Sequence, residues 1–202
     1  MILLPLYFYT NIRLILNSIL LILILAGMAT DTFATIYLNG FLKEARKRFV
    51  FKIAISIVLI NMVYVGLGFS GGLWLRSLIS SNMQAVAPAI LFLLGLKIVI
   101  KSFNAKFHEM TWELTSTPVM LGYASAVGIN IFMLGIILPF LYASFNETLI
   151  TVAVVFATAV TVAFFFGRKS HRFLLAMRIL LAGGALVMGI AIFLLLERFN
   201  VL

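Results

Sequence analysis

The chain contains six long apolar runs separated by short polar connections, and this pattern limits what it can fold into. The runs cover approximately residues 14–41, 51–69, 85–103, 117–143, 149–167 and 174–196. An α-helix needs about 20 apolar residues to cross a bilayer, and backbone polar groups in lipid must be bonded within the protein. The sequence therefore predicts an all-α, polytopic membrane protein with six transmembrane helices.

The composition supports this class and excludes others. Hydrophobic residues make up 64% of the 202 residues and charged residues 10%, which leaves no room for a large soluble domain. The net charge of +9 would suit a nucleic-acid-binding protein. Because the cations occupy short loops between apolar runs, we expect no nucleic-acid partner. There are no cysteines, which excludes disulfides and thiolate metal sites.

The basic residues are divided unevenly between the two ends of the predicted helices. Twelve of the 15 Lys and Arg residues lie in the first, third and fifth loops or in the adjoining helix ends, and three lie on the other side. The positive-inside rule then places the odd-numbered loops in the cytoplasm and both termini outside the cytoplasm.

Six spans divide into two sets of three, and an odd number of spans makes the second set run opposite to the first. The stretch at residues 94–103 is faintly echoed by residues 188–199. Many transporters consist of inverted repeats with a binding site at the membrane midplane. We predict a single transmembrane domain, residues 1–202, with one three-helix repeat at about 14–103 and an inverted one at about 117–197.

Glycines gather within several of the apolar runs, where we interpret most of them as points of close helix packing. They are Gly66, Gly68, Gly71 and Gly72 at the end of the second run, Gly122 and Gly128 in the fourth, and Gly183, Gly184 and Gly189 in the sixth. Pro139 predicts a kink late in the fourth run.

Asp31 is an acidic residue well inside the first apolar run. It lies about 11 residues, or about 16 Å, from the cytoplasmic end of that run. A charge at this depth costs at least about 2.5–3.5 kcal/mol and is tolerated where it faces protein, water or a substrate. Lys97 lies about 9 Å from the same membrane surface. We expect its side chain to extend to that surface, and the alternative is an ion pair with Asp31. Asp31 is therefore the leading functional candidate.

Three further polar residues lie at a depth similar to that of Asp31. Thr35 shares the helix face of Asp31 at the i,i+4 spacing, and Asn61 and Asn130 lie about 15 Å and 20 Å deep. Carboxylate and carbonyl oxygens are ligands that hard cations such as Mn²⁺ accept. We predict a metal site formed by Asp31, Thr35, Asn61 and Asn130 near the midplane. For each asparagine, hydrogen bonding between helices is an equally good explanation.

The stretch Gly27-Met28-Ala29-Thr30-Asp31-Thr32-Phe33-Ala34 resembles the Gly-Met-x-x-Asp-x-Phe-Ala motif of the MntP-type manganese efflux pumps, within the lysine-exporter superfamily. Residues 66–68, 94–100, 166–168 and 183–189 resemble later spans of that family, in the same order. The resemblance implies a manganese exporter. It also implies acidic residues at the positions of Leu59 and Gly128, whereas the polar Asn61 and Asn130 of this chain lie two residues further on.

These features predict a secondary transporter that exports a divalent metal cation, with manganese as the expected ion and protons as the expected exchange partner. The expected location is the inner (cell) membrane of a bacterium. The alternative is a non-transporting scaffold or complex subunit that keeps the exporter fold. Because no nucleophile–base pair or nucleotide motif occurs, we expect neither an enzyme nor a cofactor. The expected partners are the transported cation and the lipid bilayer, and a homo-oligomer is left open.

Overall fold

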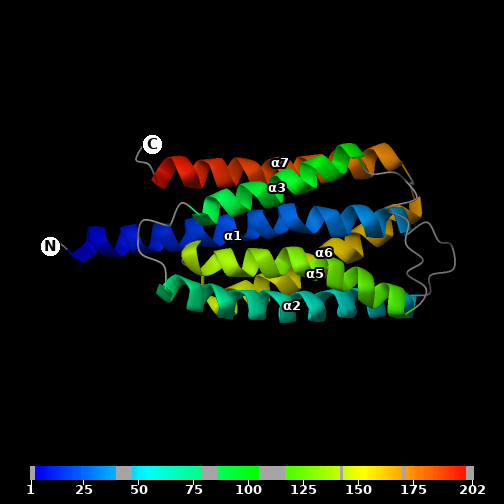
Figure 1. Cartoon of the computed structure of the whole chain (residues 1–202), viewed down its shortest axis with the longest axis horizontal. Helices are drawn as coiled ribbons and strands as arrows, with labels where there is room; N and C mark the ends of the chain where they lie inside the picture. Colours follow the sequence, from blue (N-terminus) through cyan, green and yellow to red (C-terminus); the bar gives the residue numbers. More distant parts are fainter. Residues whose placement is uncertain are drawn as a thin grey trace.

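The computed structural model describes residues 3–39, 47–78, 86–104, 117–141, 143–169 and 172–198. These residues form α1 (Leu3–Asn39), α2 (Lys47–Leu78), α3 (Val86–Asn104), α5 (Thr117–Ile137), the 3-10 helix η2 (Leu138–Leu141), α6 (Phe145–Lys169) and α7 (Phe173–Arg198). Six helices are long and apolar enough to cross a membrane, and the described residues contain no strand (Figure 1). The predicted all-α class with six membrane helices is confirmed, and the chain is an integral, multi-pass membrane protein.

The ends of three helices differ from the sequence-based expectation. α1 begins at Leu3, well before the predicted start at about residue 14. α2 continues to Leu78, well past the predicted end at residue 69. Glycine lowers helix propensity, but Gly68 and Gly72 lie against the backbone of α5, so that tertiary packing stabilises the helix there. α5 gives way to η2, which contains Pro139. Proline removes one helical hydrogen bond, and here its effect is a change from α to 3-10 geometry.

The helices pack along one another in pairs that are distant in the sequence. α1 runs parallel to α6, and α2 runs parallel to α5, whereas α3 and α7 are antiparallel (Figure 1). α1 begins and α7 ends at the same end of the bundle. An inverted repeat of three helices would relate α1 to α5 and α2 to α6, and it would therefore relate the α1–α6 pair to the α2–α5 pair. This pairing agrees with such a repeat, which itself stays a prediction.

Glycines stand where two helix backbones meet most closely. A Cβ atom on Gly68 would overlap the backbone of α5 at Phe132, and one on Gly183 would overlap the side chain of Thr30 in α1. Gly66 and Gly189, in contrast, have no atoms within 4 Å of an added Cβ. Of the nine glycines selected from the sequence, five pack closely and four have open space around an added Cβ. The four with open space are Gly66, Gly71, Gly122 and Gly189.

α1 is the central helix of the bundle. In its membrane-spanning part 61% of the residues are buried, compared with 28–50% in the other five helices. It packs extensively against α6 and α7 and makes smaller contacts with α3 and α5. Asp31 therefore lies on the helix that has neighbours on most of its faces.

Candidate functional site

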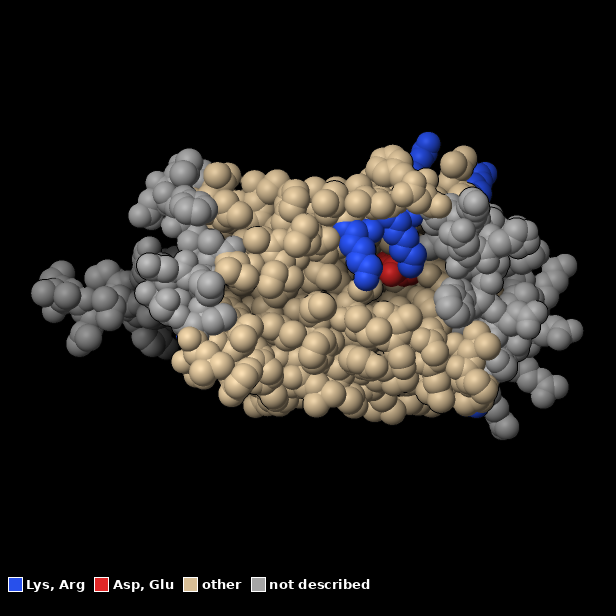
Figure 2. Space-filling model, in the orientation of Figure 1, with Lys and Arg blue, Asp and Glu red and all other residues tan. Residues whose placement is uncertain are grey.

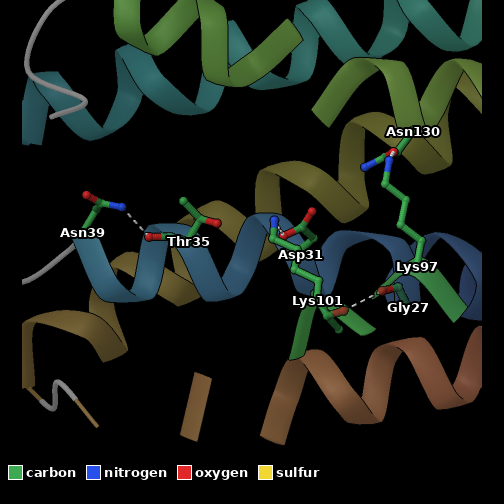
Figure 3. Close-up of polar contacts among 8 residues, drawn as sticks. Gly27, Asp31, Thr35, Asn39, Lys97, Lys101 and Asn130 are labelled. Carbon is green, nitrogen blue, oxygen red and sulfur yellow. Dashed lines mark hydrogen bonds and ion pairs between the residues drawn. The ribbon is translucent and has the colours of Figure 1, made fainter. Parts of the chain in front are cut away.

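Asp31 is buried in the bundle and forms an ion pair with a lysine of α3. The residue is 7% exposed, and its Oδ1 atom accepts a hydrogen bond from Nζ of Lys101 at 2.5 Å (Figure 3). Lys101 lies in the last turn of α3, where a cation is favoured by the negative end of the helix dipole. The cost of burying the carboxylate is thus offset by a cation that the fold itself provides.

A second lysine of α3 bonds a second predicted ligand. Nζ of Lys97 donates a hydrogen bond to Oδ1 of Asn130 in α5 at 2.6 Å (Figure 3). Lys97 and Lys101 are four residues apart, so they lie on the same face of α3. The alternative that paired Lys97 with Asp31 was wrong by one helical turn, because Lys101 holds that position. Two of the predicted metal-binding oxygens are therefore each bonded to an ammonium group.

These side chains lie in a hollow between α3 and α5. The two helices make few contacts with each other, whereas α3 packs extensively against α7 and α5 against α2. Figure 2 shows basic side chains directly over an acidic group in this hollow. Asp31 forms its floor, and the side chain of Lys101 is 41% exposed above it. One carboxylate and two ammonium groups give the hollow an excess of positive charge.

Tyr123 of α5 completes the surroundings of Asp31. Its hydroxyl lies near the hydroxyls of Thr32 and Thr35 and within electrostatic range of Asp31. Thr35 is buried, and its carbonyl oxygen accepts a hydrogen bond from Nδ2 of Asn39 at 2.8 Å. Tyr123 was not among the site residues predicted from the sequence. A tyrosine in the middle of an apolar run was the available signal, because a buried tyrosine hydroxyl usually finds a partner.

Asn61 lies on the inner face of α2. It is 0% exposed, and neither polar atom of its amide has a hydrogen-bond partner among the described residues. Leaving a buried polar group unbonded costs about 1–3 kcal/mol, so this amide is available to a ligand or a water molecule. Asn61 belongs to the interior of the bundle, but no hydrogen bond joins its amide to Asp31 or Lys101.

The two positions at which the resemblance implies acidic residues have different surroundings. Leu59 is 57% exposed on the apolar outer surface of α2, where an acidic side chain would face lipid. Gly128 is covered by the ring of Tyr64, which a Cβ atom at this position would overlap. In this chain the inward-facing polar position of α2 is therefore Asn61 rather than residue 59.

The donor set around Asp31 consists of one carboxylate and neutral oxygens. Among the described residues no group of three or more His, Cys, Asp or Glu side chains is arranged to hold a metal ion. Hydroxyl and amide oxygens can bind a hard cation, and the carboxylate can neutralise one of its charges. The arrangement can thus accept a cation when the ammonium group of Lys101 leaves the carboxylate.

One comparison with known proteins gave a match. The family described as "Putative manganese efflux pump" (Mntp) matches residues 44–195, which include nearly all of α2 to α7. The matched region does not include α1, so the Asp31 motif lies outside it. No curated protein and no solved structure matches the chain.

Proposed function

Because the chain belongs to this family of efflux pumps, we propose that it exports Mn²⁺ and that Asp31 binds the exported ion. The observation that carries the proposal is a buried carboxylate on the central helix, at the floor of an open hollow. A buried charge in a membrane helix is costly and indicates a pathway for ions or protons. A membrane protein of a pump family that places its carboxylate in such a hollow is suited to cation transport.

The surrounding oxygens would complete the coordination of the ion. Mn²⁺ prefers oxygen ligands, and the hydroxyl of Thr35 and the amide oxygen of Asn130 are the neutral oxygens proposed beside the carboxylate. The unbonded amide of Asn61 would hold the ion or its water molecules deeper in the bundle. Asp31 would supply the negative charge, and the neutral oxygens would fill the remaining coordination positions of the ion.

The hollow would receive the ion from the cytoplasm. It lies toward the end of the bundle at which α1 and α3 end, and the positive-inside rule assigns that end to the cytoplasm. At the opposite end, Ser18 of α1 donates a hydrogen bond to Glu147 of α6, and Arg76 of α2 donates one to the carbonyl of Pro139 at 2.8 Å. We propose that these contacts close the path toward the outside and that this form of the protein is open to the cytoplasm.

The orientation can be tested by chemical labelling. The positive-inside rule places both termini outside the cytoplasm. Single cysteines introduced at position 3 and at position 200, which lies outside the described residues, should react with an impermeant reagent in intact cells. Protection of both cysteines in intact cells, with labelling only after lysis, would reverse the proposed direction of transport.

The function itself can be tested with purified protein in lipid vesicles. An indicator trapped in the vesicles should report Mn²⁺ flux for the wild type, increased by an opposing proton gradient, and no flux above background for Asp31→Asn. Glu197→Gln is the matched control, because it makes the same chemical change at an exposed carboxylate near the end of α7. Flux that is equal in Asp31→Asn and the wild type would contradict the proposed role of Asp31.

A non-transporting scaffold remains the second candidate function, because the Asp31–Lys101 ion pair links α1 to α3 as a structural cross-link would. A scaffold requires that pair for stability and not for ion flux. A wild-type protein that carries no ion, and an Asp31→Asn variant that is unstable, would favour this function.

A further inference from the structure

Lys101 and Asp31 differ in how freely each can leave their ion pair. The side chain of Asp31 is 11% exposed and that of Lys101 is 41% exposed. Asp31 is carried by the central helix and is enclosed by its neighbours. The flexible stem of the lysine rises from α3 into the open hollow (Figures 2 and 3). The pair can therefore open by a movement of the lysine side chain alone.

We propose that Lys101 is a tethered competitor of the exported ion: the ion binds Asp31 only by displacing this ammonium group, and Lys101 thereby sets the ion concentration at which export begins. This inference rests on the proposed function and adds a determinant of affinity to it. The hydrogen bond at 2.5 Å places the ammonium group on the carboxylate oxygen that a metal ion would use. An ammonium group and a metal ion cannot share that position.

The second lysine, Lys97, lowers the affinity of the site for the ion further. Lys97 already bonds Oδ1 of Asn130, and it stays in the hollow when Lys101 swings away. A bound dication therefore faces two ammonium groups against one carboxylate, and their repulsion lowers its affinity. Weak binding suits export, because the ion is captured only when it is abundant and is released quickly on the other side. The second lysine also explains why removal of Lys101 alone should not give an extremely tight site.

The test is Mn²⁺ binding to the full-length protein in lipid nanodiscs, measured by the loss of the electron paramagnetic resonance signal of free Mn²⁺. Lys101→Met keeps an apolar stem of similar length and removes the charge. We expect it to bind Mn²⁺ at least about tenfold more tightly than the wild type, which corresponds to about 1.4 kcal/mol. At saturating Mn²⁺ its flux should be lower than that of the wild type, because release becomes slower.

Lys52→Met is the matched control. Lys52 lies near the start of α2, is exposed, and bonds Oγ1 of Thr117 at 3.1 Å, away from the hollow. Its removal changes the net charge of the protein equally but should leave the affinity for Mn²⁺ within about twofold of the wild type. An equal gain in both variants would show a general charge effect and would overturn the proposal.

Two further variants keep the test decisive if Lys101→Met leaves Asp31 too poorly compensated to fold, because Asp31 stays paired in Lys101→Arg and can be paired by an added ammonium ion in Lys101→Ala. Lys101→Arg retains a permanent cation and should bind Mn²⁺ no more tightly than the wild type. In Lys101→Ala the vacated space should admit free ethylammonium, which should then compete with Mn²⁺, whereas the wild type should be insensitive to it. Tighter binding by Lys101→Arg, or no competition by ethylammonium in Lys101→Ala, would overturn the proposal.

The same measurements distinguish failure of the competitor role of Lys101 from failure of the proposed Mn²⁺ site at Asp31. If Asp31→Asn loses binding and Lys101→Met binds as the wild type does, the exporter stands and the competitor role of Lys101 falls. If the double variant Asp31→Asn/Lys101→Met binds Mn²⁺ as tightly as Lys101→Met, the ion does not use Asp31, and the proposed site fails as well.

Discussion

The two sides of α1 are built in opposite ways. On the side that faces α7, Gly27 and Gly183 bring the helices together so closely that an added Cβ would overlap atoms of the partner helix. On the side that faces α3 and α5, helix contacts are few, and the gap holds Asp31 with the lysines of α3. The first side is held by apolar packing without charge, and the second by an ion pair and hydrogen bonds that water or an ion can replace.

This difference separates stability from function. In lipid, helices associate mainly through close packing of small residues, and such packing cannot be exchanged for other contacts without loss of the fold. The ion pair in the hollow contributes little close packing, but water or an ion can take the place of either partner. We therefore expect substitutions on the α7 side to affect folding and those on the hollow side to affect transport.

Gly183→Leu should have the largest effect, because it forces a side chain into the space occupied by Thr30 of α1. Overpacking typically costs about 1–3 kcal/mol and sometimes more, so we expect loss of folded protein and of export together. Size-exclusion profiles and thermal unfolding in detergent would measure this. Gly189→Leu, at a position in the same helix with no atoms within 4 Å of an added Cβ, is the control and should behave as the wild type.

Asp31→Asn should remove export to background while changing stability by less than about 1 kcal/mol, since the freed ammonium group of Lys101 is partly exposed and can be solvated. Thermal unfolding and Mn²⁺ flux measured on the same preparation would show the two effects separately. A large loss of stability would mean that the hollow is part of the packing framework, and the contrast between the two sides of α1 would fail.

Asn130→Ala should have a moderate effect limited to affinity. It removes one neutral oxygen that a water molecule can replace, and a hydrogen bond of about 1 kcal/mol corresponds to an increase in apparent Km of about fivefold. The maximal rate should stay near that of the wild type. Leu59→Ala, on the exposed face of α2, is the control. Complete loss of flux in Asn130→Ala would give this residue a role equal to that of Asp31.

Tyr123→Phe should have the smallest effect. It removes only a hydroxyl that lies near those of Thr32 and Thr35, so we expect a loss of stability of no more than about 1.5 kcal/mol and a change in apparent Km of less than about threefold. Unfolding and concentration-dependent flux would measure both. A change in flux as large as that of Asp31→Asn would show that Tyr123 itself takes part in transport.

The number and class of the helices could be predicted from the sequence because the bilayer fixes the length and polarity of a span. The helix ends were less predictable: the continuation of α2 through Gly68 and Gly72 depends on the backbone of α5, which is distant in the sequence. The family membership suggested by the motif around Asp31 was confirmed by a match to residues 44–195. The match and the motif concern different parts of the chain.

The candidate site could be predicted only in part. Depth along a helix can be read from a sequence, and this selected Asp31 and Asn61, both of which are buried. The rotation of each helix cannot be read in the same way. Whether Lys97 or Lys101 meets Asp31, and whether Tyr123 does, depends on how α3 and α5 are turned against α1. The complete ligand set of Asp31, Thr35, Asn61 and Asn130 stays a prediction.

The most direct test of the central claim is a structure determined with Mn²⁺ in the medium, with the ion located by its anomalous scattering. We predict an anomalous peak bonded to the carboxylate of Asp31, with the ammonium group of Lys101 moved away from Oδ1. A peak elsewhere, or an unchanged Asp31–Lys101 ion pair under conditions in which the protein transports Mn²⁺, would contradict the account.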